Sequence, residues 1–250
     1  MENIEIHLLK EVDLRGSTLI DGFPSVGLVS SIVANYLIGV LKLEQIGVID
    51  SPRFPTVALV KDGVPLNPVR IYAGGPEGGK VVIFISEFQP PADIVKAIAE
   101  AVLAWAIDKK CSLLVCPEGL IVDREEGAEE EIKVYGIGST PRAHKMLMEQ
   151  GVAIFEEGVI TGVAGVLLNE GRKRNFDVIS LLSEAHPDFP DARAAARVIE
   201  TVDRLLLKMD LDTGPLYEEA GRIEKELKSI HRRTGAIEKP EGPTRPSMYG

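Results

Sequence analysis

The strongest constraint on the fold is a run of seven residues at 80–86, Lys-Val-Val-Ile-Phe-Ile-Ser, which is nearly continuous in Val, Ile and Phe. A strand without polar alternation is typical of a sheet that is covered on both faces. A helical pattern follows at 91–109, and a strand pattern resumes at 113–116. Strands separated by helices predict an α/β fold in three layers, with helices on both faces of a central sheet.

A second strand-to-helix unit lies nearer the N-terminus. A strand at 18–21 runs into the turn Gly-Phe-Pro-Ser-Val-Gly at 22–27, and apolar residues then recur at helical steps as far as Val40. Since the turn opens a helix, its amides are positioned to bind an anion. The other interpretation is that its glycines allow tight turning and close packing of the helix on the sheet. Both remain open for the turn residues Gly22, Phe23, Pro24 and Gly27.

Further strand patterns occur at 4–9, 43–50, 57–61, 68–72, 152–155 and 176–183, and a helix is predicted at 142–150. After residue 183 the chain changes character, with helices predicted at 191–209 and 215–233. We therefore expect an α/β domain at 1–211, an amphipathic helix at 212–234 and a proline-rich tail at 235–250.

The last predicted helix carries a heptad-like seam. Its members are Leu216, Ala220, Ile223, Leu227 and Ile230. Two heptads are too short for an independent coiled coil, so the seam packs on the domain or joins the same helix of another subunit. The second interpretation is favoured, and it predicts a homo-oligomer of three to five subunits.

Composition excludes several classes of protein. A formal net charge of -10 argues against a nucleic-acid binder, which needs an excess of Lys and Arg. The sequence has neither a basic leader followed by a small-residue cleavage site nor about 18 uninterrupted apolar residues, so we expect a cytoplasmic protein without a membrane partner. On a predicted strand Cys111 and Cys116 would point to opposite faces. The spacing of the cysteines and the four histidines predicts no metal site.

Three candidate chemical motifs lack part of the context that their chemistry requires. The segment 74–81 matches a phosphate loop superficially, but Val81 replaces the required Ser or Thr and the lysine leads into a strand, which indicates a hairpin turn. Ser25 lacks the preceding glycine of a nucleophile elbow. Glu87 and Glu118 lie at apparent strand ends, where α/β folds bind ligands, but no base or nucleophile pairs with them. We therefore name no catalytic residue and no cofactor, and expect no enzyme activity.

The final tripeptide, Met248-Tyr249-Gly250, places an apolar residue and a tyrosine before the carboxylate. The preceding tail holds three prolines and no apolar periodicity, so we expect it to be extended. At ~3.1 Å per residue, sixteen such residues reach up to ~50 Å. The tripeptide resembles the hydrophobic-tyrosine-any (HbYX) signature with which proteasome activators enter pockets between α-subunits of the core proteasome.

Several internal segments carry a family resemblance. They are Gly-Phe-Pro-Ser-Val-Gly-Leu-Val at 22–29, Ser-Glu-Phe at 86–88, the glycine-containing run at 158–168 and Glu-Ala-His-Pro-Asp-Phe-Pro-Asp-Ala-Arg-Ala-Ala at 184–195. The chain resembles, over about 22–211, the family named after the second subunit of the proteasome-assembling chaperone pair, in its archaeal form. Ser25 departs from the commoner glycine of that motif.

The resemblance implies a phosphorylase- or hydrolase-like α/β fold without the corresponding chemistry, assembled into homo-oligomers. It also implies an assembly chaperone or ATP-independent activator whose partner is the α-ring of the core proteasome. In that role Met248 would fill an apolar groove, Tyr249 would wedge against the pocket wall and the Gly250 carboxylate would pair with a lysine. The alternatives are a small-molecule-binding enzyme that uses a cleft near Gly22–Gly27 and Glu87, and an oligomeric scaffold with sequestered tails.

Overall fold

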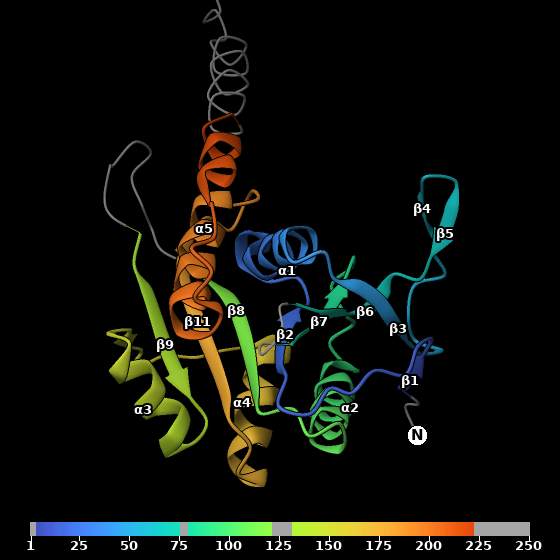
Figure 1. Cartoon of the computed structure of the whole chain (residues 1–250), viewed down its shortest axis with the longest axis horizontal. Helices are drawn as coiled ribbons and strands as arrows, with labels where there is room; N and C mark the ends of the chain where they lie inside the picture. Colours follow the sequence, from blue (N-terminus) through green and yellow to red (C-terminus); the bar gives the residue numbers. More distant parts are fainter. Residues whose placement is uncertain (1–3, 76–79, 122–131, 223–250) are drawn as a thin grey trace, which may run out of the picture.

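A computed structural model describes residues 4–75, 80–121 and 132–222 of the 250-residue chain. Its centre is a nine-stranded mixed sheet with the strand order β1-β3-β6-β7-β2-β8-β11-β9-β10 (Figure 1). The strands are β1 (Glu5–Leu8), β2 (Thr18–Gly22), β3 (Glu44–Asp50), β6 (Val69–Gly74), β7 (Val81–Ser86), β8 (Leu113–Ile121), β9 (Val134–Gly138), β10 (Ala153–Ile154) and β11 (Val178–Ala185).

The middle of the sheet is parallel. Strand β2 pairs in parallel with β7 and β8, and β8 pairs in parallel with β11. All six residues of β7 are buried, as the apolar run predicts for a central strand. Antiparallel strands flank this core, and β6 pairs with β7 up to the opposed residues Gly74 and Val81. This pairing confirms that 74–81 connects a hairpin.

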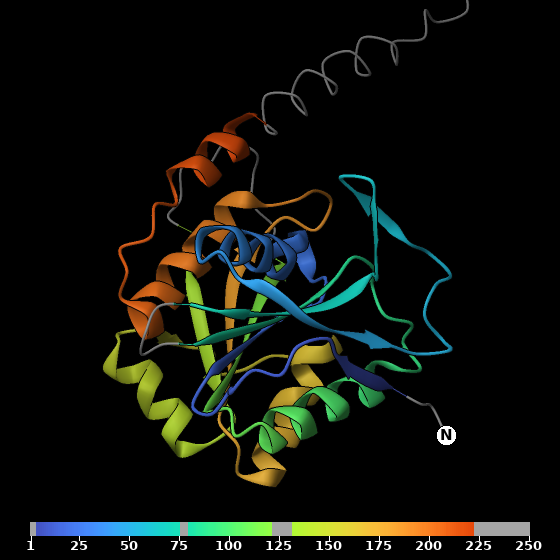
Figure 2. The same cartoon turned by 45° about the vertical axis from the view of Figure 1, so that its right-hand side comes forward.

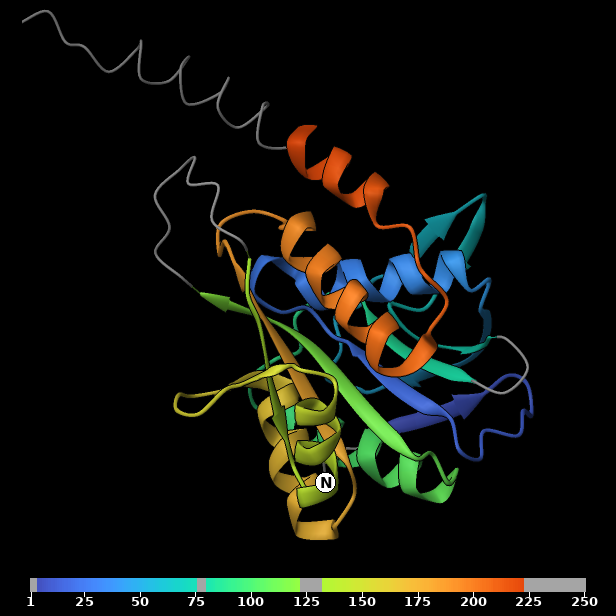
Figure 3. The same cartoon turned by 60° about the vertical axis from the view of Figure 1, so that its left-hand side comes forward.

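Helices cover both faces, which confirms the predicted three-layer α/β fold (Figures 1 and 3). Helices α1 (Val29–Val40), α3 (Pro141–Glu149) and α5 (Ala192–Val202) contribute to one apolar core, and α2 (Val95–Asp108) and α4 (Gly162–Arg174) contribute to the other. A 3-10 turn, η1 (Val26–Leu28), leads into α1, and a π-helical turn, η2 (Asp203–Leu207), follows α5. Within the described residues no helix combines the length and hydropathy that crossing a bilayer requires.

Some elements differ from the sequence-based expectation. Strand β8 continues five residues beyond Cys116, and neither helix α4 nor strand β9 was predicted. The expected opposite orientation of the two cysteines is wrong. Cys111 precedes β8 and lies outside any strand, so strand alternation does not apply to it. Both free thiols lie in the core on the α2/α4 face.

Residues 55–67 project from the body as a hairpin of β4 (Leu59–Lys61) and β5 (Val64–Leu66), which pair with each other as a separate two-stranded sheet (Figure 2). The sequence predicted the first strand but not the second. The missed signal is Asp62-Gly63, a dipeptide that favours two-residue hairpin loops. Both residues adopt positive φ, 52° and 77°.

The last described element is a helix at 214–222. Two members of the predicted seam belong to it: Leu216 packs against the α1/α5 core, and Ala220 is buried. The other three, Ile223, Leu227 and Ile230, lie outside the described residues, as do the tail with its terminal tripeptide and the glutamate-rich segment 125–131. Oligomerisation through this seam therefore stays a prediction.

Candidate functional site

The glycine turn after β2 is shaped by close packing. A Cβ atom on Gly22 would lie 2.6 Å from the Ala34 Cβ and 2.7 Å from the Phe84 carbonyl oxygen. Gly27 has φ +61°, and its Cβ would lie 2.9 Å from the His186 carbonyl oxygen. Side chains are excluded at both positions. These distances favour the packing interpretation of the turn.

Polar groups of the turn are satisfied locally. The Phe23 amide donates to the Asp21 carboxylate (3.0 Å), and the Ser30 amide donates to the Ser25 hydroxyl (3.1 Å). The Ser30 hydroxyl donates to the Phe23 carbonyl. Since these amides already have acceptors and a carboxylate lies beside them, anion binding by Phe23 and its neighbours gains no support from this geometry and stays a prediction.

The end of β2 and the middle of β8 carry a cluster of three titratable side chains on the α2/α4 face. They are Asp21, Cys116 and Glu118. Burial raises the pKa of Asp21 from 3.8 to about 7, although hydrogen bonds from the Phe23 amide and the Cys116 thiol act to lower it. Burial and the charge of Asp21 raise the pKa of Glu118 well above its usual value. Asp21 is 2% exposed, so the cluster is closed to solvent at that residue.

A second charged pair lies at the end of β7. The guanidinium of Arg70, which is buried on β6, donates to the Glu87 carboxylate, to the Tyr72 hydroxyl (3.1 Å) and to the Asn67 carbonyl (2.8 Å). Burial opposes its charge, but the bonds to Glu87 and Tyr72 hold the pKa of Arg70 above its usual value. The Glu87 side chain is 35% exposed, so one carboxylate is fixed at the surface by a buried cation.

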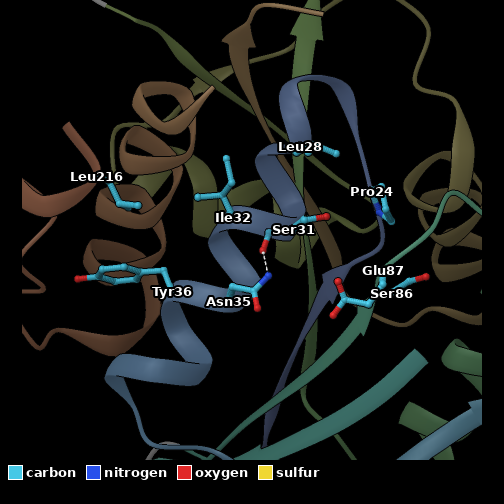
Figure 4. A pocket seen from close by; sticks show the side chains of 9 residues that line it. All are labelled: Pro24, Leu28, Ser31, Ile32, Asn35, Tyr36, Ser86, Glu87 and Leu216. Atoms are coloured by element: carbon cyan, nitrogen blue, oxygen red, sulfur yellow. Dashed lines mark hydrogen bonds between the residues drawn. The ribbon is translucent and has the colours of Figure 1, made fainter. Parts of the chain in front are cut away.

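Glu87 borders a groove of about 560 Å³ between α1 and the end of β7 (Figure 4). Helix α1 supplies one wall, and the helix at 214–222 contributes Leu216 to the lining. The lining residues are Pro24, Leu28, Ser31, Ile32, Asn35, Tyr36, Ser86, Glu87 and Leu216. The groove therefore combines apolar side chains with one acidic group. The Ser31 hydroxyl has no hydrogen-bond partner among the described residues.

The described part of the C-terminal helix lies beside α1 and α5 (Figure 3), and its Leu216 lines this groove. The Tyr36 hydroxyl donates to the Asp212 carbonyl (2.7 Å). On α5, Glu200 accepts hydrogen bonds from the hydroxyls of Thr213 and Tyr217, both at 2.9 Å. Residues 212–217 are thus held against α1 and α5.

Comparison with known proteins identifies the family of this chain. The model of the PAC2 family matches residues 19–231, most of the chain. The chain belongs to the PAC2 family. The chain is also similar to the uncharacterized protein MJ0106 of Methanocaldococcus jannaschii. The two are 27% identical over 220 residues, which cover 88% of this chain and 87% of that protein.

Two solved structures of Pyrococcus furiosus resemble this PAC2 family chain closely. PbaA, an archaeal homologue of proteasome-assembly chaperone, superposes with a TM-score of 0.82 at 29% identity and covers 94% of each chain. PbaB, an archaeal proteasome activator, has a TM-score of 0.81 at 23% identity, with 92% of this chain and all of that chain covered. At that identity the likeness to PbaB concerns the fold.

The structure brings together part of what the sequence singled out. The turn residue Pro24 and Glu87 meet at the groove, and Leu216 joins them from a segment over 120 residues away. Glu118 does not reach this groove. It lies within β8, close to Asp21 of β2. Sequence reasoning missed Asp21 and Arg70. The available signal was a charged residue within an apolar strand pattern, Leu-Ile-Asp at 19–21 and Val-Arg-Ile at 69–71.

Proposed function

We propose that this PAC2 family protein is an ATP-independent proteasome assembly chaperone or activator. It docks Met248, Tyr249 and Gly250 into pockets of the α-ring of the core proteasome. The observation that carries the proposal is family membership over 19–231 together with the likeness to PbaA, a homologue of proteasome-assembly chaperone. The terminal tripeptide supplies the chemistry for docking: an apolar side chain, a phenol and a carboxylate.

The anchored start of the C-terminal helix supports this role. Because Tyr36 and Glu200 hold residues 212–217 on the body, the start of the C-terminal helix would occupy an equivalent position in every subunit of a symmetric oligomer. One short motif binds weakly. Several motifs presented together to a symmetric ring gain affinity through effective concentration, on the order of 100-fold or more when the geometry allows simultaneous binding.

No nucleotide is needed for such a mechanism. A docked tail shifts a gate toward the open state when it binds that state better than the closed one. The energy for opening then comes from binding. In this proposal the protein acts in the cytoplasm as a homo-oligomer and carries no catalytic residue.

A small-molecule enzyme is the alternative from the sequence, and the described geometry does not favour it. Among the described residues that line the groove, the acidic side chain is Glu87, and it is engaged by Arg70. The Asp21 carboxyl, which has the perturbed pKa, is buried. A groove ligand would therefore meet a structural ion pair.

The test is peptide hydrolysis by an archaeal core proteasome with and without the full-length protein. We expect stimulation or co-elution with the core particle or its α-subunits, and loss of both on removal of Met248–Gly250. A matched control, Ser247→Ala, keeps the terminal tripeptide and should behave like the parent. A second control adds one alanine after Gly250, which moves the tyrosine away from the penultimate position and should act like the deletion.

Each variant must retain the oligomeric state of the parent, measured by light scattering. If the intact protein neither stimulates hydrolysis nor co-elutes with core particles or α-subunits, the proposal is wrong. If the truncated protein binds and stimulates as well as the parent, docking occurs through another surface.

A further inference from the structure

The β4–β5 hairpin, residues 55–67, is here called the arm. Its two strands pair in register, Leu59 with Leu66 and Lys61 with Val64, and Asp62 and Gly63 adopt the positive φ angles of a two-residue turn. Local sequence thus specifies a defined hairpin. The arm is therefore a regular β-hairpin and not an irregular loop.

The arm lacks packing partners within the described chain. None of its thirteen residues is buried, and Val57, Val60 and Val64 are 55%, 73% and 55% exposed. The substantial contact of each strand, among described elements, is with the other strand. Two strands of three residues are at best marginally stable alone in water. Val60 is opposite Pro65 and Val64 is opposite Lys61, so the two valines lie on opposite faces of the hairpin and both faces expose apolar side chains. This favours burial of the whole arm in an assembly.

The base of the arm is firmly held next to the groove. Phe54, which is buried, packs edge-on against Phe88 with ring centroids 5.1 Å apart. Arg53 forms an ion pair with Asp93. Phe88 follows Glu87 of the groove in sequence. The Glu87 amide donates to the carbonyl of Pro68, the residue directly after the arm (3.0 Å). The arm is therefore anchored at its root and projects from the body (Figure 2).

We propose that the arm of one copy packs into the α1 groove of a second copy. The groove presents Leu28, Ile32 and Leu216 with the Glu87 carboxylate at its edge, and the arm presents valines with Lys61 at its tip. Apolar surface meets apolar surface, and Lys61 approaches the exposed part of the Glu87 carboxylate, which also accepts from Arg70. The partner is a second copy because this chain carries both halves.

Net charge favours the same contact. Two copies with a formal charge of -10 each repel one another. Residues 55–67 contain one lysine and one aspartate and so carry no net charge. A neutral apolar arm is the kind of surface through which like-charged copies can approach.

The contact is made through side chains. Pro65 removes an amide from β5, and Lys61 ends β4 at the tip, two features that discourage pairing of an extra strand at an open edge. The proposal is independent of proteasome docking, because self-association is measured without the core particle.

The first test is sedimentation velocity of the full-length protein and of Val60→Asp and Val64→Asp. A buried carboxylate in place of a valine should raise the dissociation constant on the order of 10-fold or more and shift the population toward the 27.1 kDa monomer. Val159→Asp is the matched control, since Val159 is 83% exposed away from the arm, and it should associate like the parent. Unchanged association of both arm variants would overturn the proposal.

The second test identifies the receiving surface. One preparation carries Val60→Cys and another carries Asn35→Cys, an exposed position in the groove. Under mild oxidation we expect a cross-linked dimer in the mixture and little in either preparation alone, because the native Cys111 and Cys116 are buried. Equal cross-linking of Val60→Cys with itself would indicate arm-on-arm contact and contradict the proposal. A parent that stays monomeric at every concentration would also contradict it.

Discussion

The backbone amide of Asp191 donates a 2.8 Å hydrogen bond to the carbonyl oxygen of Gly27, and so joins two motif segments that lie more than 160 residues apart. The Asp191 carboxylate accepts from the amides of His186 (3.1 Å) and Ala194 (2.9 Å), which caps α5. The glycine turn and the loop after β11 therefore form one unit at the start of α1 and α5.

Gly27→Ala should destabilise the fold, because Gly27 has φ +61° and an added Cβ would lie 2.9 Å from the His186 carbonyl oxygen. We expect a loss of roughly 2 kcal/mol or more in the free energy of unfolding, measured by urea denaturation. Gly39→Ala is the matched control on α1, where nothing lies within 4 Å of the added Cβ, and it should stabilise by about 0.5–1 kcal/mol. Equal effects would contradict a role of Gly27 in this junction.

Asp21 makes stability depend on pH. Its folded-state pKa, raised by burial from 3.8 to about 7, means that the folded protein holds a proton which the unfolded chain has released. The contribution of Asp21 to stability is therefore fully present below pH ~4 and is lost as pH rises toward 7, by about 1.4 kcal/mol per pH unit and ~4 kcal/mol in all. Asp21→Asn should reduce this slope and raise the free energy of unfolding at pH 7.5.

The slope should not vanish in Asp21→Asn, because burial also raises the pKa of Glu118, with the same sign. The measurement is urea denaturation at several values between pH 4 and pH 8. The exposed Asp108 offers a control: Asp108→Asn should leave the slope as in the parent. An unaltered slope in Asp21→Asn would show that this carboxyl ionises normally in the folded protein.

Glu87→Gln should cost stability because the buried Arg70 guanidinium loses its charged partner. Since Glu87 is partly exposed, we expect about 1–3 kcal/mol, below the effect of breaking a fully buried pair. Asp93→Asn removes the partner of Arg53 in an ion pair whose side chains are about half exposed, and it should cost under ~1 kcal/mol. Chemical denaturation of both variants measures the difference, and a larger effect for Asp93→Asn would refute this ranking.

Tyr217→Phe should loosen the start of the C-terminal helix, since its hydroxyl donates to Glu200 (2.9 Å). Loss of one such bond, about 1 kcal/mol, should speed amide hydrogen exchange at 214–222 roughly five-fold. Tyr36→Phe, which loses the bond to the Asp212 carbonyl, should act in the same direction. Tyr135→Phe lies outside this contact and serves as the control. Exchange unchanged in both test variants would mean that packing alone holds the helix.

Much of the architecture follows from local pattern. Three elements are recognisable from local sequence alone: the continuous apolar strand β7, the helical apolar pattern of α2 and the glycine turn before α1. Together they predict a three-layer α/β sheet. The short strands β5 and β9 escaped prediction, because their pairing depends on distant or turn-defined neighbours more than on their own residues.

The sequence alone determined the fold class, the family motifs and the terminal tripeptide, because each is a contiguous or periodic pattern in the chain. Only the tertiary structure decided that Asp21 joins Glu118 behind the turn, that Arg70 fixes Glu87, and that Pro24, Glu87 and Leu216 share one groove beside an unpacked arm. The physical reason is that burial, a raised pKa and a shared groove are properties of residues distant in sequence that become neighbours when the sheet forms.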